Sequence, residues 1–180
     1  MVKLIILDID GVMTDGTKVY DRDHKVLSKR FFCKDFTAIK RFIASGINVI
    51  MISGDEWNRS MAEKRNIEFY CSRGKDLSLD KSLLLPILIE KYNLSLDEIA
   101  FVGDDYFDLS MFEKLKYAFC PYDSPLIIKK NSYATLTKSG GTGVVSELYD
   151  YFVENKFVED ADPEQVALLD KKEITSQEMK

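Results

Sequence analysis

The chain has 180 residues, enough for one globular domain with a sizeable core, and 46% of them are hydrophobic while 31% are charged. Its formal net charge is −5 and no apolar run is long enough to span a membrane, so we expect neither a membrane protein nor a basic nucleic-acid-binding protein. The N-terminus also lacks the basic region and long apolar segment of a secretion signal, which favours a cytoplasmic location.

Apolar runs alternate with helix-like patterns along most of the chain. The first run, residues 2–7, ends in Asp8-Ile9-Asp10-Gly11, which places two carboxylates one residue apart at the end of a buried strand. The alternation predicts an α/β, Rossmann-like fold in which a mostly parallel sheet lies between two layers of helices. Further strands are expected at 47–52, 67–71, 99–102, 117–120 and 133–136, and helices at 35–45, 57–65, 80–92, 105–115, 124–130 and 143–154.

One region, about residues 17–33, breaks this alternation. Two short apolar segments flank the charged sequence Asp21-Arg22-Asp23-His24-Lys25, which predicts a β-hairpin with these residues at its tip. We expect this hairpin, called the flap below, to hang over the strand ends or to project toward a partner, with His24 exposed. No other segment is long enough to form a separate cap domain.

The acidic surplus lies at the C-terminal end of the chain. Residues 153–180 contain eight acidic residues and four lysines, so they contribute −4 to the net charge, and residues 1–152 contribute −1. We therefore expect one domain over residues 1–155 and an acidic tail over 156–180 that is either a surface helix or disordered.

Later strands also end in polar residues. Ser53 ends the second long apolar run, Asp104-Asp105 follow the run at 99–102, and Lys81 begins a predicted helix. Because the carboxyl ends of parallel strands lie at one edge of a sheet, these side chains are expected to converge with the first pair of aspartates. The converging set is Asp8, Asp10, Ser53, Lys81, Asp104 and Asp105.

These residue types together predict phosphoryl transfer assisted by a metal ion. Carboxylate oxygens suit Mg²⁺, while a lysine and a hydroxyl suit phosphoryl oxygens. One carboxylate can attack phosphorus to form an aspartyl-phosphate, and another can protonate the leaving oxygen and later deprotonate the hydrolytic water. Taken singly, Asp104 and Asp105 can instead be helix N-caps, and Ser53 can be a strand-end cap.

The motifs resemble those of a known superfamily. The order Asp8-x-Asp10-Gly11-Val12, then Ser53, then Lys81, then Gly103-Asp104-Asp105-x-x-Asp108 resembles the four motifs of the haloacid dehalogenase-like phosphatases. The longer string 8–16, the flap and the Gly-Gly-x-Gly sequence at 140–143 are similar to the capless branch that contains 3-deoxy-D-manno-octulosonate 8-phosphate and nonulosonate 9-phosphate phosphatases. The resemblance covers about residues 1–152.

The resemblance implies a role for each matching residue. Asp8 would be the nucleophile and Asp10 the general acid and base, and Mg²⁺ would be bound by Asp8, the backbone carbonyl of Asp10, and Asp104. It also implies a homotetramer in which the flaps pack at the centre and the Gly-Gly-x-Gly segment helps to close a neighbour's site. The phosphoryl group would be held by Ser53, Gly54 and Lys81, with Asp105 and Asp108 supporting the lysine and the metal.

The chain departs from the octulosonate branch at three points. Those enzymes usually carry arginine after the Ser-Gly pair, whereas this chain has Asp55-Glu56, which resembles the nonulosonate branch and makes both acids candidate substrate-binding residues. The arginine of an Ala-x-Arg-Glu sequence after Gly-Gly-x-Gly is replaced by Ser146. The loop before Lys81 is also longer than usual, so Lys75 is an alternative for the lysine role.

The sequence therefore predicts a Mg²⁺-dependent phosphatase for the phosphate of a 2-keto-3-deoxy sugar acid, as used in lipopolysaccharide or sialic acid biosynthesis. The substrate would be 3-deoxy-D-manno-octulosonate 8-phosphate or a nonulosonate (KDN or sialic acid) 9-phosphate, and no nucleic acid or membrane partner is expected. Two alternatives stay open: a phosphatase for another small phosphate, and a non-catalytic oligomerisation module like that of some acylneuraminate cytidylyltransferases. Such modules tend to lose the catalytic carboxylates, which this chain has.

Overall fold

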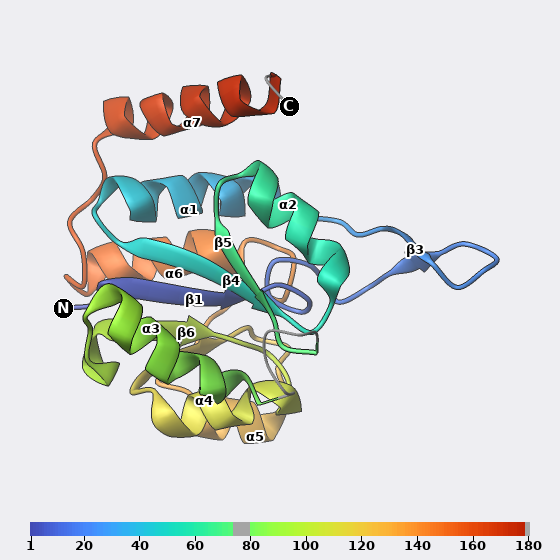
Figure 1. Cartoon of the computed structure of the whole chain (residues 1–180). Helices are drawn as coiled ribbons and strands as arrows, with labels where there is room; N and C mark the ends of the chain where they lie inside the picture. The colour runs from blue at the N-terminus through green and yellow to red at the C-terminus, as the bar shows by residue number, and fades with distance from the viewer. Residues whose placement is uncertain (74–79, 179–180) are drawn as a thin grey trace.

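A six-stranded parallel sheet forms the centre of the computed structural model, which describes residues 1–73 and 80–178 (Figure 1). The strand order is β5-β4-β1-β6-β7-β8, and every neighbouring pair is parallel. From β1 the chain builds the sheet outward through β4 and β5, then returns to add β6 on the other side of β1. This reversal is the switch point at which open α/β sheets bind ligands. The strands are Leu4–Asp8 (β1), Asn48–Ser53 (β4), Glu68–Cys71 (β5), Ile99–Val102 (β6), Tyr117–Cys120 (β7) and Ala134–Thr135 (β8).

Helices cover both faces of the sheet, and each face has its own hydrophobic cluster. All five residues of β1 are buried, which explains why this strand forms an uninterrupted apolar run rather than an alternating one. One face packs under α1 (Cys33–Ala44), α2 (Arg59–Lys64) and α6 (Val144–Glu154). The other face packs under α3 (Leu84–Tyr92), α4 (Leu109–Lys114) and α5 (Leu126–Asn131).

The predicted three-layer α/β fold is confirmed, and the main differences concern how three helices begin. The patterns at 57–65, 80–92 and 105–115 each form a short 3-10 helix followed by an α-helix. An aspartate precedes each of these turns and accepts a hydrogen bond from a backbone N–H within it. This bond satisfies one of the free N–H donors at the helix start, where the first turn is of the tighter 3-10 type. The 3-10 helices are Glu56–Asn58 (η1), Lys81–Leu83 (η2), Leu96–Glu98 (η3, before β6) and Tyr106–Asp108 (η4).

The flap is an antiparallel hairpin of Val19–Tyr20 (β2) and Val26–Ser28 (β3) that projects away from the body of the molecule (Figure 1). His24 lies in its tip, is exposed and has a positive φ of 59°. Apolar side chains on the flap are exposed as well, including Leu27 at 59%. Within the described residues no cap domain accompanies the sheet, as the sequence predicts.

The tail contains a helix, α7 (Pro163–Glu178), which lies along the outer side of α1 (Figure 1). Lys40 of α1 forms ion pairs with Asp170 and with Glu173, the latter at 2.9 Å between Nζ and Oε2. Within the described part of the chain, no helix combines the length and the apolar character needed to cross a bilayer.

Candidate active site

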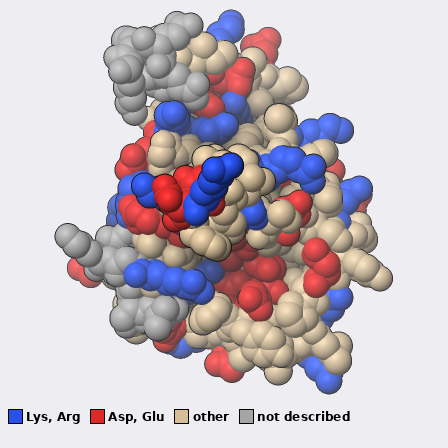
Figure 2. Space-filling view, turned by 90° about the vertical axis from the view of Figure 1, so that its right-hand side faces the viewer, with Lys and Arg blue, Asp and Glu red and all other residues tan. Residues whose placement is uncertain are grey.

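A cavity of about 580 Å³ opens at the carboxyl edge of the sheet, where β1, β4 and β6 end. Viewed from the side on which the flap projects, acidic side chains gather in this hollow and lysine or arginine side chains flank it (Figure 2). Its volume lies within the usual range for small-molecule sites. The edge that the sequence predicts as the ligand-binding edge is thus a hollow with a strongly polar lining.

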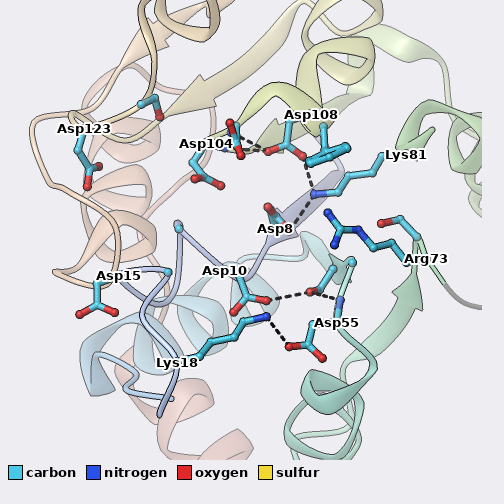
Figure 3. Close-up of a pocket in the computed structure, with 18 residues that line it drawn as sticks. Asp8, Asp10, Asp15, Lys18, Asp55, Arg73, Lys81, Asp104, Asp108 and Asp123 are labelled. Carbon is cyan, nitrogen blue, oxygen red and sulfur yellow. Dashed lines mark hydrogen bonds and ion pairs between the residues drawn. The ribbon is translucent and has the colours of Figure 1, made fainter. Parts of the chain in front are cut away.

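Asp8, Lys81 and Asp108 form a buried charged cluster at the floor of the cavity (Figure 3). The ammonium of Lys81 lies 2.9 Å from Asp8 Oδ1 and 2.5 Å from Asp108 Oδ1. Asp108 also accepts hydrogen bonds from the backbone N–H groups of Asp104 and Asp105, at 2.9 and 3.2 Å, which fixes its carboxylate beneath the lysine. Burial alone would lower the pKa of Lys81, but the two carboxylates outweigh it and raise that pKa.

Asp104 completes an acidic group that fits a divalent cation. Carboxylate oxygens of Asp8, Asp104 and Asp108 lie within 4.8 Å of one another. Asp104 Oδ1 is buried and has no hydrogen-bond partner among the described residues, an arrangement that a cation would satisfy. Gly11 is needed for this approach, because a Cβ there would lie 2.0 Å from Asp104 Oδ2. Since both oxygens of Asp108 are already bound, one to Lys81 and the other to backbone N–H groups, while only Oδ1 of Asp8 contacts Lys81, Asp8 and Asp104 are the side chains left for a metal ion.

The crowding of these acids raises their pKa values. Burial raises the pKa of Asp8 to about 7, helped by Asp108 and opposed by Lys81. Burial and the neighbouring Asp8 and Asp108 raise the pKa of Asp104 to about 9. The cluster therefore holds protons at neutral pH unless a cation replaces them.

Asp10 belongs to a second group of contacts, which lies on the flap side of the cavity. Its Oδ2 accepts hydrogen bonds from Ser53 Oγ at 3.2 Å and from Asn58 Nδ2 at 2.9 Å. Lys29, from the flap, donates to Oδ1 at 2.7 Å and to Oδ2 at 2.9 Å. Asp8 and Asp10 are thus one residue apart in sequence but have separate sets of partners.

Asp55 is held by the two lysines at the base of the flap. Its Oδ2 lies 2.7 Å from Lys18 Nζ and 2.9 Å from Lys29 Nζ, and its Oδ1 accepts the backbone N–H of Trp57 at 3.0 Å. Partial burial would raise the pKa of Asp55, but these donors outweigh it and lower the pKa to about 2. Asp55 lines the cavity, yet most of its hydrogen-bonding capacity is already used within the protein.

The remaining predicted residues fall into three groups. Gly54 lines the cavity beside Ser53, whereas Glu56 is not among the described lining residues and pairs with Arg59 instead. Asp105 is exposed and caps η4, the role that the sequence leaves open for it. Lys75, the alternative to Lys81, lies outside the described residues.

The Gly-Gly-x-Gly segment packs against the loop that follows β1 in the same chain. The N–H of Gly141 donates to the carbonyl of Val12 at 2.9 Å, and a Cβ at Gly140 would lie 2.2 Å from the carbonyl oxygen of Gly11. These glycines therefore allow a close backbone contact beside the site.

Sequence reasoning missed several residues of the site, among them Lys18, Lys29, Asn58, Arg73 and the two carboxylates Asp15 and Asp123. Lys18 and Lys29 lie at the two ends of the flap, and only the folded hairpin brings them to the cavity edge. Asn58 lies in η1, one turn beyond the Ser-Gly pair. Arg73 points into the cavity (Figure 3), with its guanidinium 4.8 Å from the ring of Phe107. The one feature of the sequence that could have pointed to the two lysines is the surplus of basic residues in the flap. Basic residues are equally common on an exposed hairpin without a role in the site, so this surplus alone does not identify them.

Comparisons with known sequences agree with this geometry. A family model described as haloacid dehalogenase-like hydrolase matches residues 76–148. The 3-deoxy-D-manno-octulosonate 8-phosphate phosphatase KdsC of Escherichia coli (strain K12) is 30% identical over 150 residues, which cover 83% of this chain and 78% of the relative.

Solved structures with the same fold include two that hold metal ions. The cobalt-bound deoxy-D-mannose-octulosonate 8-phosphate phosphatase of Haemophilus influenzae has a TM-score of 0.77 and 27% identity, covering 87% of this chain and 90% of that chain. The 3-deoxy-D-manno-octulosonate 8-phosphate phosphatase of Moraxella catarrhalis, in complex with a magnesium ion, a phosphate ion and KDO, has a TM-score of 0.76 and 25% identity, covering 87% and 89%.

Proposed function

Because the chain belongs to the haloacid dehalogenase-like phosphatases and is a phosphoric monoester hydrolase of the 3-deoxy-D-manno-octulosonate 8-phosphate phosphatase type, we propose that it hydrolyses the phosphate ester of a 2-keto-3-deoxy sugar acid with eight or nine carbons. The observation that carries this proposal is the meeting of Asp8, Ser53, Lys81 and Asp104 around one cavity at the switch point of the sheet. Carboxylates, a hydroxyl and an ammonium are the groups that phosphoryl transfer by way of an aspartyl-phosphate requires.

The reaction would proceed in two steps at Asp8. In the first, an Asp8 carboxylate oxygen bonds to phosphorus, the bond from phosphorus to the sugar oxygen breaks, and the Asp10 carboxyl gives its proton to that oxygen. In the second, Asp10 takes a proton from water as the water oxygen bonds to phosphorus, and the bond from phosphorus to the Asp8 oxygen breaks, which releases phosphate and the free Asp8 carboxylate. Ser53 and Lys81 would hold the phosphoryl oxygens during both steps.

Mg²⁺ would be held by the carboxylates of Asp8 and Asp104 and the backbone carbonyl of Asp10. When bound, it would offset the negative charge of the nucleophile and of the phosphoryl group, which otherwise repel each other. The buried Asp104 oxygen without a partner supports this assignment. Asp105, which caps η4 and lines the cavity, and Asp108, which binds Lys81, would support the lysine and the metal.

The mouth of the cavity offers many hydrogen-bond acceptors for a polyhydroxylated substrate. Asp15 and Asp123 line it, and carboxylates accept hydrogen bonds from sugar hydroxyls, whereas Asp55 in the same wall is already bound to Lys18 and Lys29. Arg73 and Lys18 supply the positive charge that a sugar acid needs, in place of the arginines that the octulosonate branch usually carries. We propose that Arg73 and Lys18, standing in place of those arginines, favour a nonulosonate 9-phosphate over the octulosonate 8-phosphate.

The flap fits a role in assembly. Its apolar side chains Val19, Tyr20 and Leu27 are 53%, 48% and 59% exposed. Exposed apolar groups gathered on a projecting hairpin are typical of a protein–protein contact rather than of a monomer surface. We propose that they pack at the centre of a homotetramer of a cytoplasmic biosynthetic enzyme. A scattering or sedimentation mass tests this: the wild type should have four times the chain mass, and Leu27→Glu should reduce it.

Phosphate release from both sugar acid phosphates, with Mg²⁺ and with a chelator, tests the proposed function. The wild type should need Mg²⁺, and Asp8→Asn should abolish turnover on either substrate while keeping the fold. Equal, slow phosphate release by wild type and Asp8→Asn would overturn the aspartyl-phosphate mechanism. A strong preference for the octulosonate would overturn only the choice of substrate.

A further inference from the structure

The flap supplies a lysine, Lys29, whose side chain is fully buried next to Asp10 and Asp55. Its side chain is 0% exposed, whereas the side chains of its partners Asp10 and Asp55 are 22% and 23% exposed. The ammonium donates to both carboxylate oxygens of Asp10, to Asp55 at 2.9 Å and to Asn58 Oδ1 at 3.0 Å. It also lies 5.3 Å from the centre of the Trp57 ring.

Lys29 binds the carboxylate of Asp10 but does not itself line the cavity. Among the described residues that line the cavity, Asp10 and Asp55 are included and Lys29 is not. A bound substrate could therefore touch Asp10, but it would meet Lys29 only through that carboxylate. A buried ammonium is costly unless its charge and its protons have partners, and here two carboxylates and an amide oxygen supply them.

We propose that Lys29 is a positioning residue for the phosphatase reaction, which fixes the orientation of the Asp10 carboxylate and is itself held by Asp55. This inference rests on the proposed role of Asp10 in proton transfer. A carboxylate with one free torsion can turn away from the leaving oxygen, and a misplacement of about 1 Å can cost about a hundredfold in rate. Lys29 bridges both oxygens of Asp10 and Asn58 binds one of them, so the rotation is blocked from two elements even when Ser53 turns its hydroxyl to a phosphoryl oxygen.

The proposal also explains why an acid stands at position 55. Asp55 lies between Lys18 and Lys29 and accepts from both, so an arginine there would bring a third cation to two lysines. Asp55 is then a partner of the flap lysines as well as a residue of the cavity wall. Its effect on catalysis would pass through Lys29 and Asp10.

A comparison of two leaving groups separates positioning of the proton donor from a general loss of structure. A sugar alkoxide must be protonated as it leaves, whereas p-nitrophenolate leaves readily as the anion, so only the first depends strongly on Asp10. The value of kcat/KM covers the steps up to departure of the leaving group. For Lys29→Met we expect kcat/KM to fall about a hundredfold on the sugar acid phosphate and less than about tenfold on p-nitrophenyl phosphate.

Two further variants show whether Lys29 acts through Asp10. Lys29→Arg, which keeps the charge and the donors, should recover part of the loss on the sugar phosphate. In an Asp10→Asn background, Lys29→Met should cause little additional change in the ratio of the two kcat/KM values, because the group that it positions is already absent. Lys25→Met is the control, since it removes an exposed lysine of the same flap that is not among the described residues lining the cavity, and it should leave the ratio unchanged.

The outcomes are distinct. Equal loss on both substrates, or full additivity with Asp10→Asn, would overturn the positioning role and leave Lys29 as a structural residue. If Lys29→Met does not fold, Lys29→Gln and Lys29→Arg make the same comparison, because glutamine keeps one donor without the charge. Turnover by Asp8→Asn would instead mean that the proposed function itself is wrong.

Discussion

The two halves of the cavity are built in different ways. On one side Asp8, Lys81, Asp104 and Asp108 stand at the ends of buried strands and the starts of helices, close to the sheet. On the other side Asp10 and Asp55 depend on Lys18 and Lys29, which belong to a hairpin that projects from the molecule (Figures 1 and 3). The comparison teaches that Asp8, the proposed nucleophile, is fixed by the core of the fold, while Asp10, the proposed proton donor, is held by a lysine of a projecting hairpin.

The largest effect is expected for Lys81→Met, on the nucleophile side. It would leave Asp8 and Asp108 buried without their cation, so we expect the free energy of unfolding to fall by about 3–5 kcal/mol and activity to fall at least about a thousandfold. Denaturant unfolding and phosphate release measure the two losses. Lys91→Met is the control, because its pair with Glu68 is partly exposed, at 49% and 28% of the two side chains, and should be worth less than about 1 kcal/mol. Equal destabilisation by both variants would contradict the buried cluster.

The next effect concerns pH and again belongs to the nucleophile side. The pKa values of Asp8 and Asp104 are raised to about 7 and about 9, so between pH 4 and 9 the folded state binds more protons than the unfolded state. The stability of the metal-free protein should therefore fall as pH rises, by about 1.4 kcal/mol per pH unit for each proton of difference. Mg²⁺ should reverse most of this fall, because it replaces the protons.

Thermal melts in chelator and in Mg²⁺ from pH 5 to pH 9 make this measurement. Asp104→Asn is the variant to compare, since it removes both the carboxyl with the higher pKa and one proposed metal ligand. In that variant both the pH slope without metal and the stabilisation by Mg²⁺ should shrink. A metal-free protein whose melting temperature rises steadily over this range would contradict the protonated cluster.

A smaller effect is expected on the flap side for Asp55→Asn. The change keeps the shape of the side chain but removes the charge that holds the two lysines, so we expect kcat on the sugar acid phosphate to fall about tenfold with little change in KM. A rise in KM with kcat unchanged would show instead that Asp55 acts mainly by binding substrate. Steady-state kinetics on the preferred sugar acid phosphate separates the two.

The same division explains what the sequence could predict. The fold, and the meeting of Asp8, Ser53, Lys81 and Asp104, follow from local patterns, because each residue adjoins a strand end or opens a helix and parallel strands align those ends. Lys29 could not be found in this way. It lies 19 residues from Asp10, and no periodicity shows that the end of a hairpin folds back to the strand from which it left. Glu56 was predicted from its neighbour Asp55, but the 3-10 turn at η1 directs it to Arg59 instead.

The last effect, also about tenfold, tests the boundary between the two halves, where Arg73 points into the cavity near Lys81 (Figure 3). Arg73 lies over Gly54, where a Cβ would be 2.9 Å from its Nε, so the glycine leaves the room that the guanidinium occupies. An arginine beside the Ser-Gly pair can donate to a phosphoryl oxygen, and the loss of such a charged hydrogen bond costs about 1.5–3 kcal/mol. We therefore expect Arg73→Gln to weaken inhibition by inorganic phosphate about tenfold. Arg59→Gln, outside the cavity, should leave it unchanged. If Arg73→Gln raises KM for the sugar acid phosphate but leaves phosphate inhibition unaltered, Arg73 binds the sugar acid rather than the phosphoryl group and belongs to the specificity side of the cavity.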